Sequence, residues 1–213
     1  MADLNHKTTG DPGRTKSGTK EAILAAAFAE FSDQGLAGAR VDRIANLAGV
    51  NKAMLYYHFA SKENLYHEAI RHHVAAATDQ LSEQFDDSVP IEEVLQRIAV
   101  QYARIFTANP KFIRILLWEL ANPDSEMIRR MAELLVQSNL PIRLRQRMNQ
   151  EIKAGRWRDL DVKQLLVTFI TLNVGYFLLR PLVHRVLTVE DQDSFARERA
   201  AAIVEIFLNG VRK

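Results

Sequence analysis

The residues best suited to chemistry lie between residues 40 and 62, where basic, amide and phenolic side chains gather. Such side chains donate hydrogen bonds to phosphate oxygens and to base edges, so the combination is typical of a surface that contacts nucleic acid. We therefore predict a DNA-binding surface in this segment. Its candidate residues are Arg40, Asn51, Lys52, Ala53, Tyr56, Tyr57, His58 and Lys62.

Two short helices are expected to position these side chains. The pattern predicts one helix from about Arg40 to Leu47, a tight turn at residues 48–50, and a second helix that Asn51 caps and that lasts to about Phe59. A glycine turn between two short helices indicates a helix-turn-helix, provided that an earlier helix clamps it. That clamping helix is predicted from Thr19, as N-cap, to Gly35. The expected inner packing comes from Ile44, Ala45, Val50, Leu55 and Phe59.

The run over residues 44–59, IANLAGVNKAMLYYHF, and the SKENL at 61–65 closely resemble the signature of the TetR family of bacterial regulators. The resemblance covers about residues 19–66, and beyond it only the helical pattern agrees. It implies that Lys52 and Ala53 read base edges and that Tyr56, His58 and Lys62 hold phosphates. Tyr57 stands at a variable contact position. A buried, structural role for Tyr56 is the alternative.

Two departures from the family pattern fall at the start of the first short helix. Ala39 stands where a capping Thr is usual, and Arg40 stands where Ser or Thr is frequent. An arginine at a helix N-terminus can add a charge-assisted bond to a phosphate, so we expect Arg40 to contact DNA. The alternative is a solvated Arg40 that pairs with Asp33 or Asp42.

The remaining chain predicts an all-α protein of about nine helices, with no period-2 strand and no internal repeat. Pro90 and Pro110 open helices, and a long helix after Pro123 is expected to kink near Pro141 and end at Gly155. Ser61 is expected to cap the fourth helix. Asp161 with Gln164 and Thr188 with Asp191 resemble capping boxes, and Asn209-Gly210 closes the last helix. The expected division is a tail at 1–18, a DNA-binding domain at 19–65, and a ligand-binding and dimerisation domain at 66–213.

A homodimer is expected through the last two helices. The run from Leu165 to Leu179 is apolar on all sides, which indicates a helix covered by core on one side and by a partner on the other. A membrane span is disfavoured because this run is shorter than about 20 residues and carries polar groups. The last helix offers Phe195, Ile203, Ile206 and Phe207, so a four-helix bundle across a two-fold axis is predicted.

A ligand pocket is expected inside the C-terminal helices, and it would suit an apolar or aromatic molecule with one or two polar groups. Ordinary core packing is the alternative for each candidate. Trp118, beside Glu119, and Asn173, inside an apolar helix, stand out because buried polar groups need partners. The candidates are Tyr102, Phe106, Trp118, Met131, Asn173 and Phe177.

Composition excludes several classes of protein. The 213 residues include no cysteine, which rules out disulfides, thiolate nucleophiles and zinc-thiolate sites, and a net charge of +2 gives little support to DNA binding by itself. The polar start lacks the apolar stretch of a secretory signal, so a cytoplasmic location is expected. No cofactor, metal site or catalytic constellation is expected, since His58, His67, His72 and His73 lack acidic partners at ligand spacing.

These observations predict a sequence-specific transcriptional regulator. The favoured form is a repressor that a small molecule releases from a palindromic operator. An activator or a multi-site architectural DNA-binding protein of the same fold is the alternative. A hypothesis from another class is an enzyme or binding module in the C-terminal helices with a DNA-binding appendage, but no catalytic pattern supports an enzyme.

Overall fold

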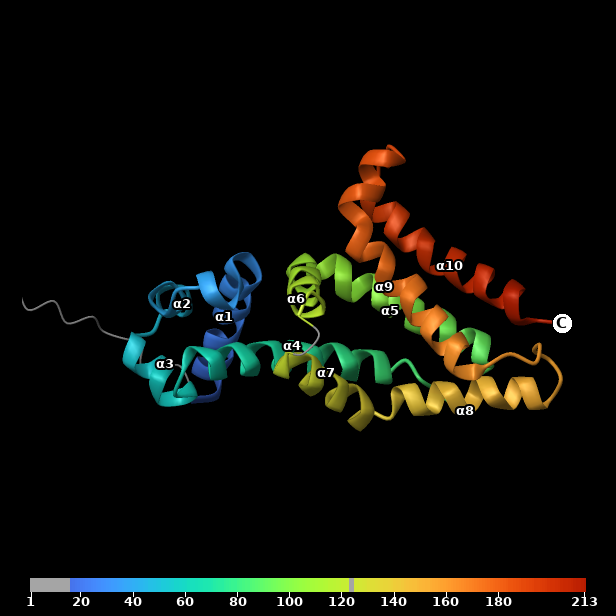
Figure 1. The fold of residues 1–213 in the computed structure, drawn as a ribbon, viewed down its shortest axis with the longest axis horizontal. Helices are drawn as coiled ribbons and strands as arrows, with labels where there is room; N and C mark the ends of the chain where they lie inside the picture. The colour runs from blue at the N-terminus through green and yellow to red at the C-terminus, as the bar shows by residue number, and fades with distance from the viewer. Residues whose placement is uncertain (1–15, 123–124) are drawn as a thin grey trace, which may run out of the picture. The chain divides into compact units, whose positions relative to one another are not determined.

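The computed structural model describes residues 16–122 and 125–213 of the chain. Within them the chain forms ten α-helices, and the only strand-like pairing is an isolated bridge between Trp157 and Arg212 (Figure 1). The predicted all-α fold is confirmed, with one helix more than expected. The chain divides into two compact units, one ending at His72 and the other running from His73 to Lys213.

The N-terminal unit consists of α1 (Lys16–Gly38), α2 (Val41–Ala48), α3 (Lys52–Phe59) and the first half of α4 (Lys62–Ser82). Its core combines one face of α1 with the inner faces of the other three helices. Phe31 of α1 meets Tyr66 of α4 edge-on, with ring centroids 4.9 Å apart. The fully buried members include Ile23, Ala27, Phe31, Ile44, Leu55 and Leu65.

Helix α1 differs from its prediction at both ends. It starts at Lys16, so Thr19 lies inside the helix and does not cap it, and the first fifteen residues of the expected tail lie outside the described residues. Gly35 does interrupt the regular helix, with φ at 65°, a value that glycine adopts without steric cost. One further turn follows it and ends at Gly38.

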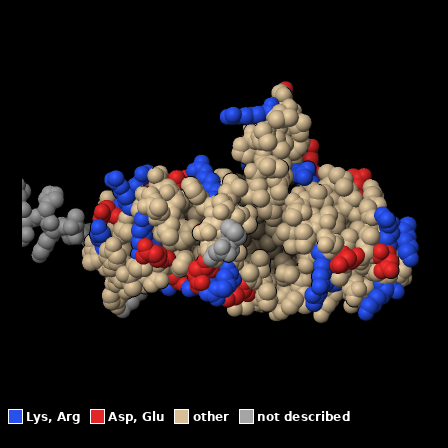
Figure 2. Space-filling view, viewed as in Figure 1, with Lys and Arg blue, Asp and Glu red and all other residues tan. Residues whose placement is uncertain are grey.

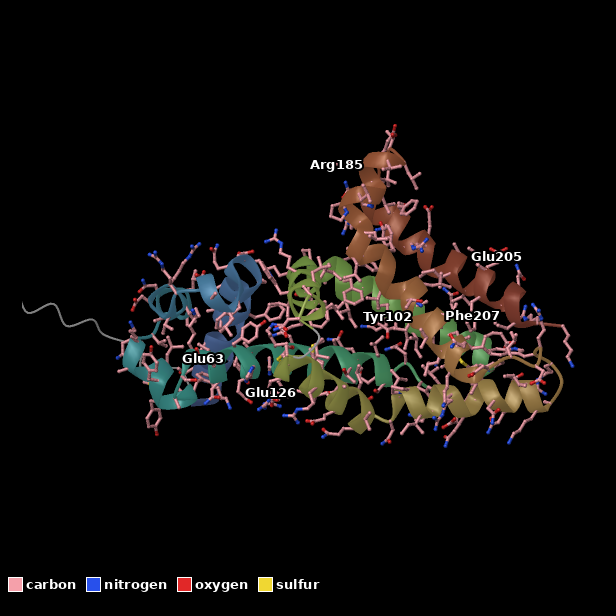
Figure 3. All side chains as sticks on the ribbon, viewed as in Figure 1. Glu63, Tyr102, Glu126, Arg185, Glu205 and Phe207 are labelled. Atoms are coloured by element: carbon pink, nitrogen blue, oxygen red, sulfur yellow. The ribbon has the colours of Figure 1, made fainter. Side chains whose placement is uncertain are left out.

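The C-terminal unit contains the second half of α4 and six further helices. They are α5 (Ile91–Ala108), α6 (Pro110–Leu120), α7 (Glu126–Gln137), α8 (Leu140–Lys153), α9 (Val162–Val186) and α10 (Gln192–Val211). Helix α5 packs most extensively against α10 and also against α9, while α8 packs against α9. Figure 3 places Tyr102 on α5 and Phe207 on α10, and Phe207 meets both Trp157 and Phe169 edge-on.

The single kinked helix expected after Pro123 is wrong, because the chain forms α7 and α8 with a break at Ser138 and Asn139. Asn139 adopts a left-handed conformation with φ at 58°, which ends α7 and turns the chain. Pro141 then lies in the first turn of α8, where a missing backbone N–H costs nothing. The proline therefore starts a helix here and does not kink one.

The helix caps were predicted with mixed success. Asp161 caps α9 by accepting the N–H of Lys163 at 2.7 Å, as expected. Asp191 caps α10, accepting from Asp193 and Ser194, whereas Thr188 lies in the preceding turn with φ at 50°. The expected box of Thr188 with Asp191 is therefore wrong. Helix α10 also continues past Asn209 and Gly210 to Val211.

Helix α9 is longer than its apolar run suggested. It has 25 residues and a mean hydropathy of 1.6 over its most apolar window, so by length and composition alone it is long enough to cross a membrane. A membrane span was disfavoured because the apolar run is shorter than about 20 residues, and that argument does not hold for the whole helix of 25 residues. In the structure this helix packs against α5, α8 and α10, and its Asn173 is buried among them, as in a helix of a helical bundle.

Candidate DNA interface

Helices α2 and α3 form the predicted helix-turn-helix. Gly49 ends α2 in a left-handed conformation with φ at 67°, which a residue with a Cβ adopts at a cost. The N–H of Val50 then donates to the carbonyl of Ala45 at 3.0 Å, closing the turn. Ile44, Ala45 and Ala48 are buried on the inner side of α2. The small residues at the turn thus let α3 begin directly against α2.

Helix α3 presents an outer face of polar and aromatic side chains. Asn51 caps it, accepting the N–H of Met54 on Oδ1 at 2.8 Å, which confirms the predicted cap. Leu55 and Phe59 are buried and anchor the inner side. Tyr57 is 77% exposed and Tyr56 is 44% exposed, so the reading of Tyr56 as a buried structural tyrosine is wrong. Asn51, Lys52 and Ala53 are exposed as well, and His58 is half-buried beside the Tyr57 ring.

The missing threonine cap of α2 is replaced from a different helix. Glu30 of α1 is only 3% exposed, and its Oε1 accepts the backbone N–H of Arg40 at 3.3 Å. Its Oε2 lies 3.2 Å from Nε of Arg43, one turn into α2. A carboxylate at a helix N-terminus satisfies free N–H groups and complements the helix dipole. Glu30 therefore ties α1 to the start of α2, a role that sequence reasoning missed.

Glu30 could have been found from the sequence. It lies on the apolar face of α1, seven residues after Ile23 and three after Ala27, where a charge is expected to be buried. A carboxylate is almost never buried without a partner. The pattern alone is therefore enough to indicate an ionic or hydrogen-bonded role for Glu30, although not its partner Arg43.

Lys52 forms an ion pair within the helix-turn-helix. Its Nζ lies 2.9 Å from Oδ1 of Asp42, and both side chains are at least half exposed. The hydrogen bond and the charge of Asp42 raise the pKa of the Lys52 ammonium above its ordinary value. Lys52 is therefore fully protonated at neutral pH, and its charge is partly offset by a neighbouring carboxylate.

The side chains of Arg40 and Lys62 differ in whether they contact another part of the protein. Arg40 is the N-cap residue of α2, its side chain is exposed, and no ion pair to it is present in the described part of the chain. The alternative pairing of Arg40 with Asp42 is not what the structure has, since Asp42 pairs with Lys52. Lys62 donates from Nζ to the carbonyl of Ala37 at 3.2 Å, which fixes the start of α4 beside the end of α1. Ser61 caps α4 as predicted, accepting the N–H of Asn64 at 3.0 Å.

The predicted pocket residues of the C-terminal unit fall into two groups. Three of them form one aromatic cluster, in which the Phe106 ring lies 6.0 Å from Tyr102 and 5.1 Å from Phe177. Burial raises the pKa of Tyr102 to about 12. Asn173 is buried, but its amide donates to the carbonyl of Phe169 at 2.8 Å and so already has a partner in its own helix.

The structure does not bring Trp118 and Met131 into the aromatic cluster. Trp118 is 55% exposed on α6, and Met131 is half-buried on α7. The polar group beside Trp118, Glu119, is buried and accepts a hydrogen bond from the Ser125 hydroxyl at 2.6 Å. The described residues contain no group of three or more His, Asp or Glu side chains arranged to hold a metal ion.

Comparison with known sequences supports the assignment of the N-terminal unit. The profile of the family described as "Bacterial regulatory proteins, tetR family" matches residues 23–69. The transcriptional regulator RutR of Escherichia coli K12 is 39% identical over 95 residues, which are 45% of either chain. The transcriptional repressor NicS of Pseudomonas putida is 30% identical over 116 residues, 54% of this chain and 55% of its own. The chain thus aligns with about half the length of these relatives.

Solved structures extend the likeness of the fold to both units. A putative transcriptional regulator of Streptomyces coelicolor is 26% identical, with a TM-score of 0.68 over 91% of this chain and 98% of its own. The regulator FadR of Bacillus subtilis, solved with stearoyl-CoA, has a TM-score of 0.71 over 89% of this chain and 98% of its own, at 17% identity. The helix-turn-helix at residues 23–69 therefore matches that of the bacterial regulatory proteins of the tetR family, and both units have the fold of solved transcriptional regulators.

Proposed function

We propose that this protein is a dimeric transcriptional repressor that binds a palindromic operator and leaves it when a small molecule binds the C-terminal unit. The observation that carries the proposal is the outer face of α3. It exposes Lys52, Tyr56 and Tyr57 on a short helix whose other side is buried. Such a helix inserts its N-terminal residues into the major groove.

The roles of single residues follow from their position. Lys52 and Ala53 lie at the N-terminal end of α3, the end that reaches base edges in this motif. Tyr56, Tyr57 and His58 lie further along the helix, where phenol and imidazole groups suit phosphate oxygens. Arg40 precedes α2 and Lys62 begins α4, and the N–H groups at the start of a helix also favour phosphate. Asn51 caps α3 through its Oδ1, so its Nδ2 can donate a hydrogen bond to the backbone of the DNA.

Dimerisation is supported by exposed apolar side chains on the last two helices. Val167, Leu179, Leu182 and Val186 are exposed along α9, and Ile206 is 64% exposed on α10. Figure 2 shows mostly uncharged surface on the face of the projecting ends of α9 and α10, with charged side chains at the tip and along both margins. A contiguous apolar face of this kind is typical of a subunit interface. We propose that two copies pack these helices into a four-helix bundle.

A two-fold dimer explains how short helices achieve specificity. One copy of α3 covers only a few base pairs, whereas two copies related by a two-fold axis read half-sites about 34 Å apart. A ligand that binds better to a dimer with a different separation of its α3 helices would weaken operator binding by that difference in affinity. The structurally similar regulator FadR of Bacillus subtilis has been solved with stearoyl-CoA, which supports small-molecule control. A cytoplasmic location suits this role.

The test is selection from a random pool of double-stranded DNA followed by binding measurements on the enriched sequence. We expect a palindromic consensus, binding by one dimer, and a steep fall in affinity with added salt. Enrichment of a single unpaired half-site, or of no sequence, would overturn the proposal. Transcription from a promoter that carries the consensus then separates a repressor from an activator, and binding at many unrelated sites would favour an architectural protein.

A further inference from the structure

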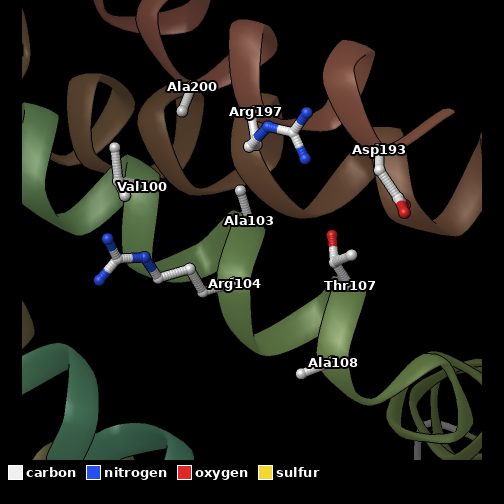
Figure 4. A pocket seen from close by; sticks show the side chains of 8 residues that line it. All are labelled: Val100, Ala103, Arg104, Thr107, Ala108, Asp193, Arg197 and Ala200. Atoms are coloured by element: carbon white, nitrogen blue, oxygen red, sulfur yellow. The ribbon is translucent and has the colours of Figure 1, made fainter. Parts of the chain in front are cut away.

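A groove of about 510 Å³ opens between α5 and α10 in the C-terminal unit (Figure 4). The apolar part of its lining consists of small side chains, which leave space between the two helices. A volume of this order is typical of sites for small organic molecules. The lining residues are Val100, Ala103, Arg104, Thr107 and Ala108 of α5, with Asp193, Arg197 and Ala200 of α10.

Two arginines line this apolar groove from opposite walls. Figure 4 shows Arg104 extending from α5 on one side and Arg197 from α10 on the other. Neither guanidinium has a hydrogen bond or an ion pair with another residue in the described part of the chain. Most arginines of α7 and α8, by contrast, pair with carboxylates, as Arg129 does with Glu126 and Arg143 with Asp87.

Apart from Arg104, the polar groups of the groove lie together at one end. The hydroxyl of Thr107 points from α5 toward the side of α10 that carries Arg197 and Asp193 (Figure 4). The negative charge of Asp193 is already partly compensated, because Arg180 of α9 lies 3.7 Å from its Oδ1. The three arginines and one aspartate give this region a net positive charge. It favours an anion that Arg197 binds with help from the Thr107 hydroxyl.

We propose that the groove between α5 and α10 binds an organic carboxylate with a compact apolar body. Its carboxylate would accept charge-assisted hydrogen bonds from Arg197 and Thr107, while its apolar part covers Ala103, Val100 and Ala200. Arg104, at the opposite rim, adds a second favourable charge. Guanidinium is the cation best suited to hold a carboxylate through two parallel bonds.

The proposed dimer leaves this groove accessible. Arg197 and Ile206 are nine residues apart on α10, which is two and a half turns at 3.6 residues per turn. The two side chains therefore lie on opposite sides of the helix. A partner subunit packed on the face of Ile206 would not cover the groove. Binding in the groove does not require DNA, so its test is independent of the proposed repressor function.

The experiment is calorimetric titration of the full-length protein, without DNA, with 1-naphthoate, 1-naphthalenemethanol and sulfate. The alcohol has the same apolar body without the charge, and sulfate has charge without the body. We expect naphthoate to bind at least about tenfold more tightly than either control compound, the factor that one charge-assisted bond supplies. Equal binding of naphthoate and the alcohol, or no binding of naphthoate, would overturn the proposal.

Variants locate the site. Arg197→Gln should weaken naphthoate binding by about tenfold or more, and Arg104→Gln should weaken it less. Both side chains are exposed, so neither substitution should affect folding, which circular dichroism checks. Arg145→Gln on α8 is the matched control, because Arg145 is also exposed but lies outside the groove lining. Unchanged affinity in Arg197→Gln, or an equal loss in Arg145→Gln, would contradict the site.

Discussion

The two units of this protein carry their functional surfaces in opposite ways. In the N-terminal unit the candidate contact face is polar, and its residues lie within a span of 23 positions in the sequence, from Arg40 to Lys62. In the C-terminal unit the candidate surfaces are mainly apolar and join helices far apart in the chain, such as α5 with α10. A locally encoded face can be read from a motif, whereas a face assembled by packing depends on the fold.

Substitutions in the proposed dimer interface on α9 and α10 should have the largest effect on operator binding. Replacing both Leu182 and Ile206 by Asp places charges on the proposed apolar interface, and we expect the dimer to dissociate at about micromolar concentration. Operator affinity should then fall by at least about 100-fold, because the second half-site no longer binds in the same molecule. Sedimentation velocity and fluorescence anisotropy measure the two effects.

The matched control for the pairing surface is Leu135→Asp, at another exposed leucine on α7. It should leave both the dimer and operator binding intact. A dimer that survives the double substitution, or one that Leu135→Asp disrupts equally, would show that a different surface pairs the subunits. In that case the apolar faces of α9 and α10 would need another explanation.

The buried carboxylate of the N-terminal unit should control its stability. Glu30→Gln removes the ion pair with Arg43 and weakens the bond to the Arg40 N–H, so we expect the free energy of unfolding to fall by about 1–2 kcal/mol. The loss stays moderate because Arg43 is largely exposed and water can solvate it. Chemical denaturation gives the measurement, and exposed Glu63→Gln on α4 should change it by only about 0.5 kcal/mol or less. Equal effects of the two substitutions would show that Glu30 does not have this stabilising role.

The ion pair on the contact face predicts substitutions of opposite sign. Lys52→Ala should weaken operator binding and lower the slope of log affinity against log salt by about 0.9, because it removes one positive charge that displaces a counterion when the lysine enters the groove. Asp42→Asn should strengthen binding, because it frees Lys52 and removes a negative charge close to the DNA. Tyr56→Phe should weaken binding across all sequences by the loss of one hydrogen bond. Anisotropy titrations at several salt concentrations would contradict this account if Asp42→Asn bound more weakly than the parent protein.

Sequence reasoning was most successful where short-range rules decide the structure. The turn at Gly49 and the caps at Asn51 and Ser61 depend on residues within one helical turn, and the structure confirms all three. Glu30 was missed because its partners, Arg40 and Arg43, lie ten or more residues away and meet it only after α1 and α2 pack. The apolar face of α1 indicates that Glu30 needs a partner, but a local pattern does not indicate which residues supply it.

The C-terminal unit shows the limits of the same rules. Pro141 was expected to kink a helix, but the left-handed Asn139 had already ended it, and asparagine in that conformation is hard to anticipate from one sequence. Trp118 was expected near a pocket because a polar group beside it, Glu119, would need a partner, yet the packing of α6 buries Glu119 and exposes Trp118. The groove between α5 and α10 was not predicted at all, since it depends on how those two helices diverge.

The smallest predicted effect concerns Arg40, where the chain departs from the family pattern. Its exposed side chain has no ion pair in the described residues, while its backbone N–H is held by Glu30. The helix start is therefore stabilised without the arginine side chain, which is left free for a phosphate. Arg40→Ser should lower the salt slope by about 0.9 and weaken binding a few-fold, with thermal stability unchanged. Arg43 provides the comparison, because its guanidinium is paired with Glu30 and Arg43→Ser should reduce stability as well. If Arg40→Ser left both the slope and the affinity unchanged, Arg40 would be a solvated surface residue and the start of α2 would contact DNA only through its backbone.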